Sequence, residues 1–230
     1  MYSQRWLVAI VLLFLGSVAL VYWAFMPPSL EKTVAQLGQA TASSKLVVVL
    51  AEGSNARIYA YQKQGEDWKE VLQTVGFVGR NGVSTTKKEG DGTSPAGLYA
   101  FGRAFGLGAD PASLMPYSQL TGKEFWVDDP QSEYYNTWVN SSVQPKDWSS
   151  AKDLSKETVA YAYAIVIEYN TAPVVKGAGS ALFLHCTLQK PTSGCVSVPE
   201  PAMIQLLHFI DGHTKIAIAR SVQELQTFRK

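Results

Sequence analysis

The sequence predicts a mainly β domain with a few short helices, preceded by one apolar N-terminal segment. Runs rich in β-branched and aromatic residues recur along the chain between turns rich in Gly, Pro and Asp. Residues 199–210 alone combine the apolar stripe of an amphipathic helix with a Pro in the first turn. Residues 6–25 contain no charge and are long enough to span the roughly 30 Å core of a bilayer as a helix.

Composition narrows the class of protein. The chain has 230 residues, of which 47% are hydrophobic, and 2 Cys. These values favour one globular domain with an appendage and exclude a disordered chain or a disulfide-rich scaffold. Residues 1–25 carry one Arg and no acid, so the remainder has 19 basic and 19 acidic residues. Because no basic run is present, we expect no binding to nucleic acid.

The apolar run divides the chain into three expected parts. Residues 1–26 are expected to be an uncleaved membrane anchor, residues 27–45 a spacer, and residues 46–230 the folded domain. Aromatic Trp6 and Trp23 mark the two ends of the run, and Arg5 favours a cytoplasmic N-terminus. We therefore expect a single-pass membrane protein with its domain outside the cytoplasm. A cleaved signal peptide and an apolar core helix are the alternatives.

The elements of the domain can be assigned in order. Residues 27–45 are expected to be largely irregular, with room for a short helix at 30–37. Residues 45–50, 56–61 and 69–78 have the composition of strands joined as hairpins. A Gly-rich stretch, 79–97, precedes a further strand and lacks the spacing of a phosphate-binding loop.

The second half of the chain begins with a segment that lacks hydrophobic periodicity. Residues 103–155 have no clean period and favour a functional loop or short irregular elements. Residues 161–169 and 182–185 are expected to be strands, 199–210 a helix, and 215–219 the last strand.

One segment carries residues suited to chemistry. The strand at 182–185 ends at His185, and a turn containing Pro191 and Gly194 leads to Cys195. A thiol needs a neighbouring base, because its ordinary pKa of about 8.5 leaves little thiolate at neutral pH. Gly194 lets the backbone bend so that amides near Cys195 can face a developing oxyanion. His185 and Cys195 are therefore candidates for a base and a nucleophile.

Strand alternation separates the two cysteines. Ala181, Phe183 and His185 are expected on one face, with Cys186 on the other face, in the apolar layer. The residues alone leave a Cys186–Cys195 disulfide and two inert thiols open as alternatives. A zinc site is disfavoured because the chain has three His and two Cys without paired ligand spacing, and we expect neither metal nor cofactor.

Two motifs in this order resemble the L,D-transpeptidase (YkuD-type) catalytic domain. They are residues 180–185 (Ser-Ala-Leu-Phe-Leu-His) and residues 192–196 (Thr-Ser-Gly-Cys-Val). Residues 92–99 resemble the Thr-Pro-x-Gly segment of that family, and residues 126–130 and 135–136 are similar to one of its branches. The resemblance covers about residues 45–219 and implies a mainly β domain around a mixed sheet.

The resemblance also implies an activity. These enzymes attack an L,D peptide bond of a peptidoglycan stem peptide with a Cys, form a thioester, and pass the acyl group to an amine during cell-wall cross-linking or remodelling. By position, Cys195 is the nucleophile and His185 the base, and the backbone amides of Gly194 and Cys195 form the oxyanion site. An L,D-carboxypeptidase with water as acceptor and a wall-binding module without catalysis are the alternatives.

The sequence departs from the family pattern near the nucleophile. Ser193 stands where many members have His, and the interval between His185 and Cys195 is shorter than in many members. The first change removes any help from a second imidazole. The second removes part of the loop that shapes the acceptor side and therefore concerns the specificity of transfer. The candidates for substrate contact are Ser180, Phe183, Thr192, Ser193, Arg103, Tyr135 and Asn136.

Overall fold

The computed structural model describes residues 29–229. The expected anchor at 1–26 and the first residues of the expected spacer lie outside this range. Within residues 29–229, no helix is both long and apolar enough to cross a membrane. The division into anchor, spacer and domain thus remains an expectation from the sequence.

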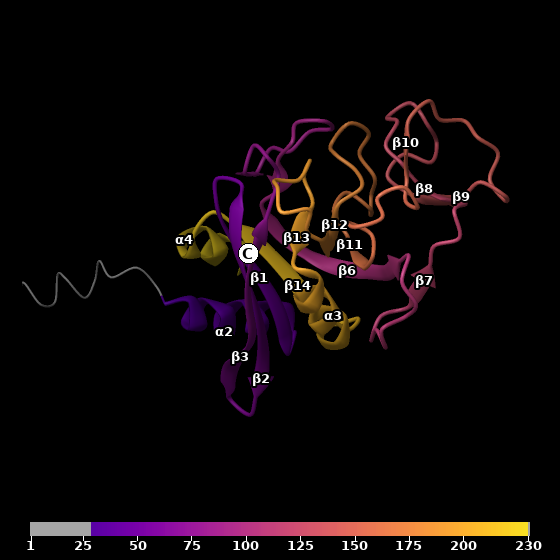
Figure 1. The fold of residues 1–230 in the computed structure, drawn as a ribbon. Helices are drawn as coiled ribbons and strands as arrows, with labels where there is room; N and C mark the ends of the chain where they lie inside the picture. Colours follow the sequence, from indigo (N-terminus) through magenta and orange to yellow (C-terminus); the bar gives the residue numbers. More distant parts are fainter. Residues whose placement is uncertain (1–28, 230) are drawn as a thin grey trace, which may run out of the picture.

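The described residues form a mainly β structure with few helices (Figure 1). In chain order the elements are α2 (Leu30–Thr41), β1 (Lys45–Glu52), β2 (Asn55–Gln64), β3 (Asp67–Phe77), β4 (Val83–Ser84), β5 (Ser94–Pro95), β6 (Gly97–Gly106), β7 (Tyr117–Gln119), β8 (Glu124–Val127), β9 (Trp138–Asn140), β10 (Ala151–Asp153), β11 (Ala164–Ile167), β12 (Phe183–Cys186), β13 (Val196–Val198), α3 (Glu200–Phe209), β14 (Lys215–Ala219), α4 (Val222–Leu225) and the 3-10 helix η1 (Gln226–Arg229).

Nine strands form one mixed sheet, in the order β11-β12-β13-β3-β2-β1-β14-β6-β7. Strand β11 also pairs with β6, so the sheet closes on itself. The expected hairpins β1–β2 and β2–β3 are antiparallel, whereas β12–β13 and β1–β14 are parallel. The mainly β mixed sheet is therefore confirmed, as are the helix α3 and the last strand β14.

The two faces of the sheet bury different sets of side chains. One face packs against α3 through a cluster that includes Leu184, Cys186 and Met203. The opposite face of β11 and β12 carries an aromatic cluster that includes Phe105, Phe183 and Cys195. Because burial of apolar area contributes roughly 25 cal/mol per Å², both clusters hold β12 and β13 firmly in place.

Two segments differ from the expectation. Most of the expected spacer is the helix α2, whose Val34 and Leu37 are fully buried against β1 and β2. Ser29 caps this helix, and the apolar stripe gives it a face to bury. Residues 103–155 contain the short strands β7 to β10, and β10-β8-β9 form a small separate sheet beside β11 and β12 (Figure 1).

The strand expected at 161–169 is shorter in the structure, because β11 covers only Ala164–Ile167. Tyr161 lies in a turn before the strand, where its backbone N–H donates to Glu157 O. After the strand, the carbonyls of Tyr169 and Asn170 accept hydrogen bonds from Asn136 instead of from a neighbouring strand. Side-chain hydrogen bonds to the backbone thus replace the ladder at this end.

Candidate active site

Adjacent parallel strands bring His185 and Cys195 to the same face of the sheet. Leu184 pairs with Val196 and His185 with Ser197, so Cys195 directly precedes β13 at the level of Phe183. Residues in register on neighbouring strands point to the same side. His185 and Cys195 therefore both face the aromatic cluster, as the alternation of residues 181–186 predicts. Both are nearly buried, at 7% and 9% exposure.

The turn before Cys195 requires glycine. Gly194 has φ 149°, and a Cβ at this position would lie 2.9 Å from Thr93 O and 3.3 Å from Lys87 Nζ. A side chain would therefore clash with the backbone of the Gly-rich segment. Close backbone approach explains the Gly in the motif.

Two hydroxyl groups hold this turn. Ser94 Oγ is fully buried and donates to Gly194 O at 2.5 Å, while it accepts from Gly79 N at 2.9 Å. Thr192 Oγ1 donates to Cys195 O at 2.6 Å and accepts from Gly194 N at 3.1 Å. The Gly194 amide is thus engaged, which corrects its expected role as an oxyanion donor. Of the two expected donors, the amide of Cys195 remains.

The imidazole of His185 is held in one tautomer. Its Nδ1 lies 2.7 Å from Cys186 O, and because a carbonyl oxygen only accepts, Nδ1 carries the proton. Nε2 is then the atom with a free lone pair. The ring packs edge-on against Tyr161, with 5.7 Å between ring centroids. Burial, assisted by the positive charge of Lys152, lowers the pKa of His185 to about 4.

The thiol of Cys195 lies among backbone groups. Its Sγ donates to Ala181 O at 3.3 Å and accepts from Phe183 N at 3.4 Å. Burial raises the pKa of Cys195, and the charges of Lys152 and Lys87 oppose that rise. At neutral pH the resting pair is therefore a neutral thiol and a neutral imidazole, which is the combination that needs proton transfer upon attack.

The lowered pKa of His185 predicts a specific acid destabilisation. The unfolded chain takes up a proton below pH 6.5, whereas the folded chain does so only near pH 4. The contribution of His185 to the free energy of unfolding therefore falls as pH drops from 6.5 to 4 and is constant below that. We expect wild type to lose about 3 kcal/mol more than His185→Gln between pH 7 and pH 4.

Urea unfolding of both proteins at pH 7, 5.5 and 4 measures this difference. Carboxylates that titrate in the same range affect both proteins equally and cancel in the comparison. An equal loss of stability in wild type and His185→Gln would show that the folded imidazole titrates normally.

The two cysteines do not form a disulfide. Both are free, and Cys186 lies on the α3 side of the sheet, where its Sγ is 3.5 Å from Tyr163 O. Burial raises the pKa of Cys186 to about 11, so this thiol is unreactive at neutral pH. The alternative of a Cys186–Cys195 staple is therefore wrong, since the side chains point to opposite faces.

Tyr135 and Asn136 are structural residues, which corrects their expected contact with substrate. Tyr135 is 1% exposed; its hydroxyl donates to Glu89 Oε2 at 2.5 Å and accepts from Gly179 N. Asn136 is 3% exposed, and its Oδ1 accepts from Trp126 Nε1 and Ala181 N. These hydrogen bonds fix the segment that leads into β12.

The other contact candidates have different surroundings. Phe183 is fully buried among Phe105, Trp126 and Tyr161. It therefore packs beneath the surface that Cys195 and His185 share and is not exposed to a ligand. Arg103 is exposed on β6, with its guanidinium 5.1 Å from the ring centroid of Trp138.

Three candidates lie on the segments that frame β12 and the Cys195 turn. Ser193 is exposed and its Oγ accepts from Arg80 Nη1 at 3.4 Å, whereas Thr192 holds the turn. Ser180 Oγ is a buried side-chain atom for which the described residues provide no hydrogen-bond partner. Ser180 and Ser193 thus stay predictions for substrate contact.

Sequence reasoning missed Ser94, Lys87 and Lys152. Ser94 lies inside the Gly-rich motif, but nothing local reveals that it bonds to residue 194. Lys87 Nζ donates to Asp91 Oδ1 at 3.1 Å and to Thr93 O at 2.8 Å beside the Cys195 turn. Lys152 belongs to the small sheet, in a region without periodicity. No local signal could have joined these three residues to Cys195.

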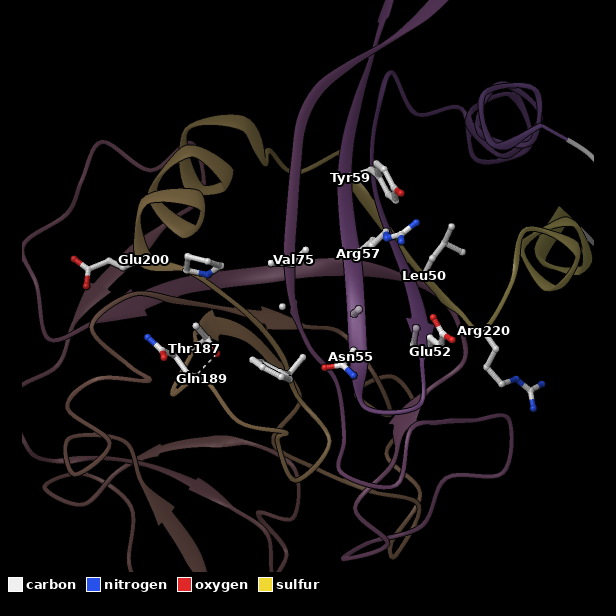
Figure 2. Close-up of a pocket in the computed structure, with 15 residues that line it drawn as sticks. Leu50, Glu52, Asn55, Arg57, Tyr59, Val75, Thr187, Gln189, Glu200 and Arg220 are labelled. Atoms are coloured by element: carbon white, nitrogen blue, oxygen red, sulfur yellow. Dashed lines mark hydrogen bonds between the residues drawn. The ribbon is translucent and has the colours of Figure 1, made fainter.

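A groove of about 980 Å³ lies elsewhere on the domain (Figure 2). Its lining comes from β1, β2 and β3, the start of α3, Arg220, and the loop after β12 with Thr187 and Gln189. Neither Cys195 nor His185 lines it. The groove is therefore not part of the catalytic site.

The fold and the pair of residues define a class of protein. A closed mixed sheet presents a buried Cys on a Gly turn and a neutral His on the neighbouring strand, an arrangement that can support a thiol nucleophile and a base. The chain matches the family model "L,D-transpeptidase catalytic domain" (YkuD) over residues 45–218. The chain therefore belongs to this family.

The chain is similar to a solved structure but not to a curated protein. No curated protein matches the chain. A solved structure, Bd1075 of Bdellovibrio bacteriovorus, is 16% identical with a TM-score of 0.43. The match covers 81% of this chain and 53% of that chain, so this chain spans about half its length.

Proposed function

We propose that the protein is a peptidoglycan L,D-transpeptidase that uses Cys195 as nucleophile and His185 as general base. The observation that carries the proposal is the shared face of β12 and β13, where both residues meet one buried cluster. Both residues also lie within residues 45–218, which match the family domain.

The proposed reaction has two stages, formation of a thioester and its release. The Cys195 proton, held by Ala181 O at rest, transfers to Nε2 of His185 as Sγ rotates and attacks the carbonyl carbon of the stem peptide. The Cys195 amide stabilises the oxyanion. His185 then returns the proton to the departing amine, the C–N bond breaks, and a thioester remains. An incoming amine, deprotonated by His185, releases the acyl group.

Two acceptors suit the proposed thioester, an amine and water. Ser193 replaces the His that many members carry, and its hydroxyl is partnered by Arg80. Water as acceptor would make the same pair an L,D-carboxypeptidase. We rank the amine first because the family model describes a transpeptidase domain.

Product analysis distinguishes the two acceptors. Purified protein with a tetrapeptide stem and a large excess of a free amine is expected to yield cross-linked or amine-exchanged peptide. The same reaction without amine is expected to yield less total turnover. Hydrolysed tripeptide alone, at every amine concentration, would assign the carboxypeptidase activity instead.

The apolar segment 6–25 supports a location for this activity. An uncleaved anchor of this length would hold the domain at the outer surface of the cytoplasmic membrane, where new stem peptides are accessible.

A further inference from the structure

Lys152 lies over the catalytic face because of the pairing of the small sheet. It stands opposite Trp126 in the β8–β10 ladder, and residues in register share a face. Trp126 packs edge-on against Phe183, with 5.0 Å between centroids. The neighbouring residue Ala151 belongs to the cluster on the other side of the small sheet. The side chain of Lys152 therefore projects toward the site.

The burial of the residue that follows β10 agrees with this placement of Lys152. Leu154, two residues after Lys152, is fully buried in the same cluster as Phe183 and Cys195. Lys152 itself is half-buried. Burial raises the pKa of Cys195, and the charge of Lys152 opposes this larger effect. Burial lowers the pKa of His185, and the charge of Lys152 lowers it further. The register of β8 and β10, together with this charge effect, therefore places Lys152 at the rim of the cluster that contains Cys195.

No acidic residue of the described chain neutralises Lys152. The ion pairs of residues 29–229 do not include it. The carboxylates on the small sheet are already occupied: Asp153 pairs with Lys156, and buried Glu124 accepts from Thr121. A half-buried cation without a partner at the edge of an apolar cluster is available to pair with an anion.

We propose that Lys152 binds a free carboxylate of the substrate, one residue beyond the peptide bond that Cys195 attacks. The inference rests on the proposed function, because it assigns part of the substrate of the same site. A carboxylate is the anion that a peptide end supplies, and a charge-assisted hydrogen bond in a partly dehydrated site is among the stronger polar contacts. Lys152 would thereby restrict attack to the bond next to a free chain end.

Two peptides that differ only at the C-terminus test this role. The tetrapeptide stem with a free carboxylate and the same peptide with a terminal carboxamide are compared by kcat/KM. We expect wild type to prefer the carboxylate at least ~10-fold. Lys152→Met is expected to reduce this preference to within about twofold by slowing the carboxylate peptide alone. Lys152→Arg is expected to retain most of it.

Lys156 provides the matched control. It lies on the same segment, its side chain is 81% exposed, and it pairs with Asp153. Lys156→Met is expected to leave the preference unchanged. If Lys152→Met slows both peptides equally, the residue acts on the thiol or on the fold, and the inference is overturned. An unchanged preference in Lys152→Met overturns it as well.

Binding separates this inference from the proposed function. Calorimetric titration of the same two peptides into Cys195→Ala measures affinity without turnover. The subsite is supported if Cys195→Ala binds the carboxylate peptide more tightly than the carboxamide peptide. This difference should be lost in the double variant with Lys152→Met and kept in the double variant with Lys152→Arg. The result would hold even if wild type turned over neither peptide. Absence of turnover in wild type would refute the proposed function alone. Equal affinities in Cys195→Ala would refute the carboxylate subsite.

Discussion

Replacing Cys195 by Ala is expected to abolish turnover of stem peptides, with a loss of at least about 10³-fold. In the proposed mechanism this thiol forms the thioester, and no other described nucleophile lies at this position of the aromatic cluster. Intact mass after incubation with a carbapenem provides the direct measurement. Wild type is expected to gain the mass of one molecule, and Cys195→Ala none.

Cys186→Ala is the matched control for this experiment. Cys186 is the other free thiol of the chain, but it is buried on the α3 side with a raised pKa. The variant is expected to form the adduct as wild type does. An adduct that persists in Cys195→Ala and disappears in Cys186→Ala would contradict the assignment of the nucleophile.

The largest expected effect on stability is at Asn136. Its side chain makes four hydrogen bonds to three segments: Oδ1 accepts from Trp126 and Ala181, and Nδ2 donates to the carbonyls of Tyr169 and Asn170. Asn136→Ala leaves these buried groups unpaired. We expect the free energy of unfolding to fall by about 3–5 kcal/mol, measured by urea unfolding at pH 7.

Two controls separate hydrogen bonding from backbone conformation. Asn136 has φ 57°, a region that Gly adopts without strain and Ala does not. Asn136→Gly is therefore expected to recover only about 1 kcal/mol of the loss. Asn81→Ala removes an exposed side chain with one bond, to Asp91 O, and is expected to cost under about 1 kcal/mol. Full recovery in Asn136→Gly would mean that strain, not hydrogen bonding, sets the cost.

Asn136→Ala is also expected to reduce activity. Asn136 Oδ1 holds the amide of Ala181, and the carbonyl of Ala181 accepts the thiol proton of Cys195. Asn136 thus positions the backbone that accepts the hydrogen bond of the Cys195 thiol. It acts through Ala181 and does not contact the substrate.

Much of the fold could be predicted because its signals are local. The strands β1, β2, β3 and β14 and the helix α3 follow from composition and periodicity within a few residues of each element. The same alternation placed His185 and Cys186 on opposite faces. These properties depend on neighbours in the sequence, so one sequence is enough to predict them.

The short elements between residues 103 and 155 could not be predicted. Strands β8, β9 and β10 have three or four residues each, too few for a period to stand out. Their pairing stabilises them, and the pairing joins residues far apart in the chain. The contacts of the nearby Asn136 were missed for the same reason.

The local sequence is enough to predict the candidates for chemistry, one thiol after a Gly turn and one imidazole at a strand end, and the face that each of these strand residues occupies. The tertiary structure alone decided how that chemistry is supported. It engages the Gly194 amide with Thr192 and joins Ser94 to a turn 100 residues away. It also brings the charge of Lys152 to the site. Such contacts depend on how distant strands pack together, and no local pattern encodes them.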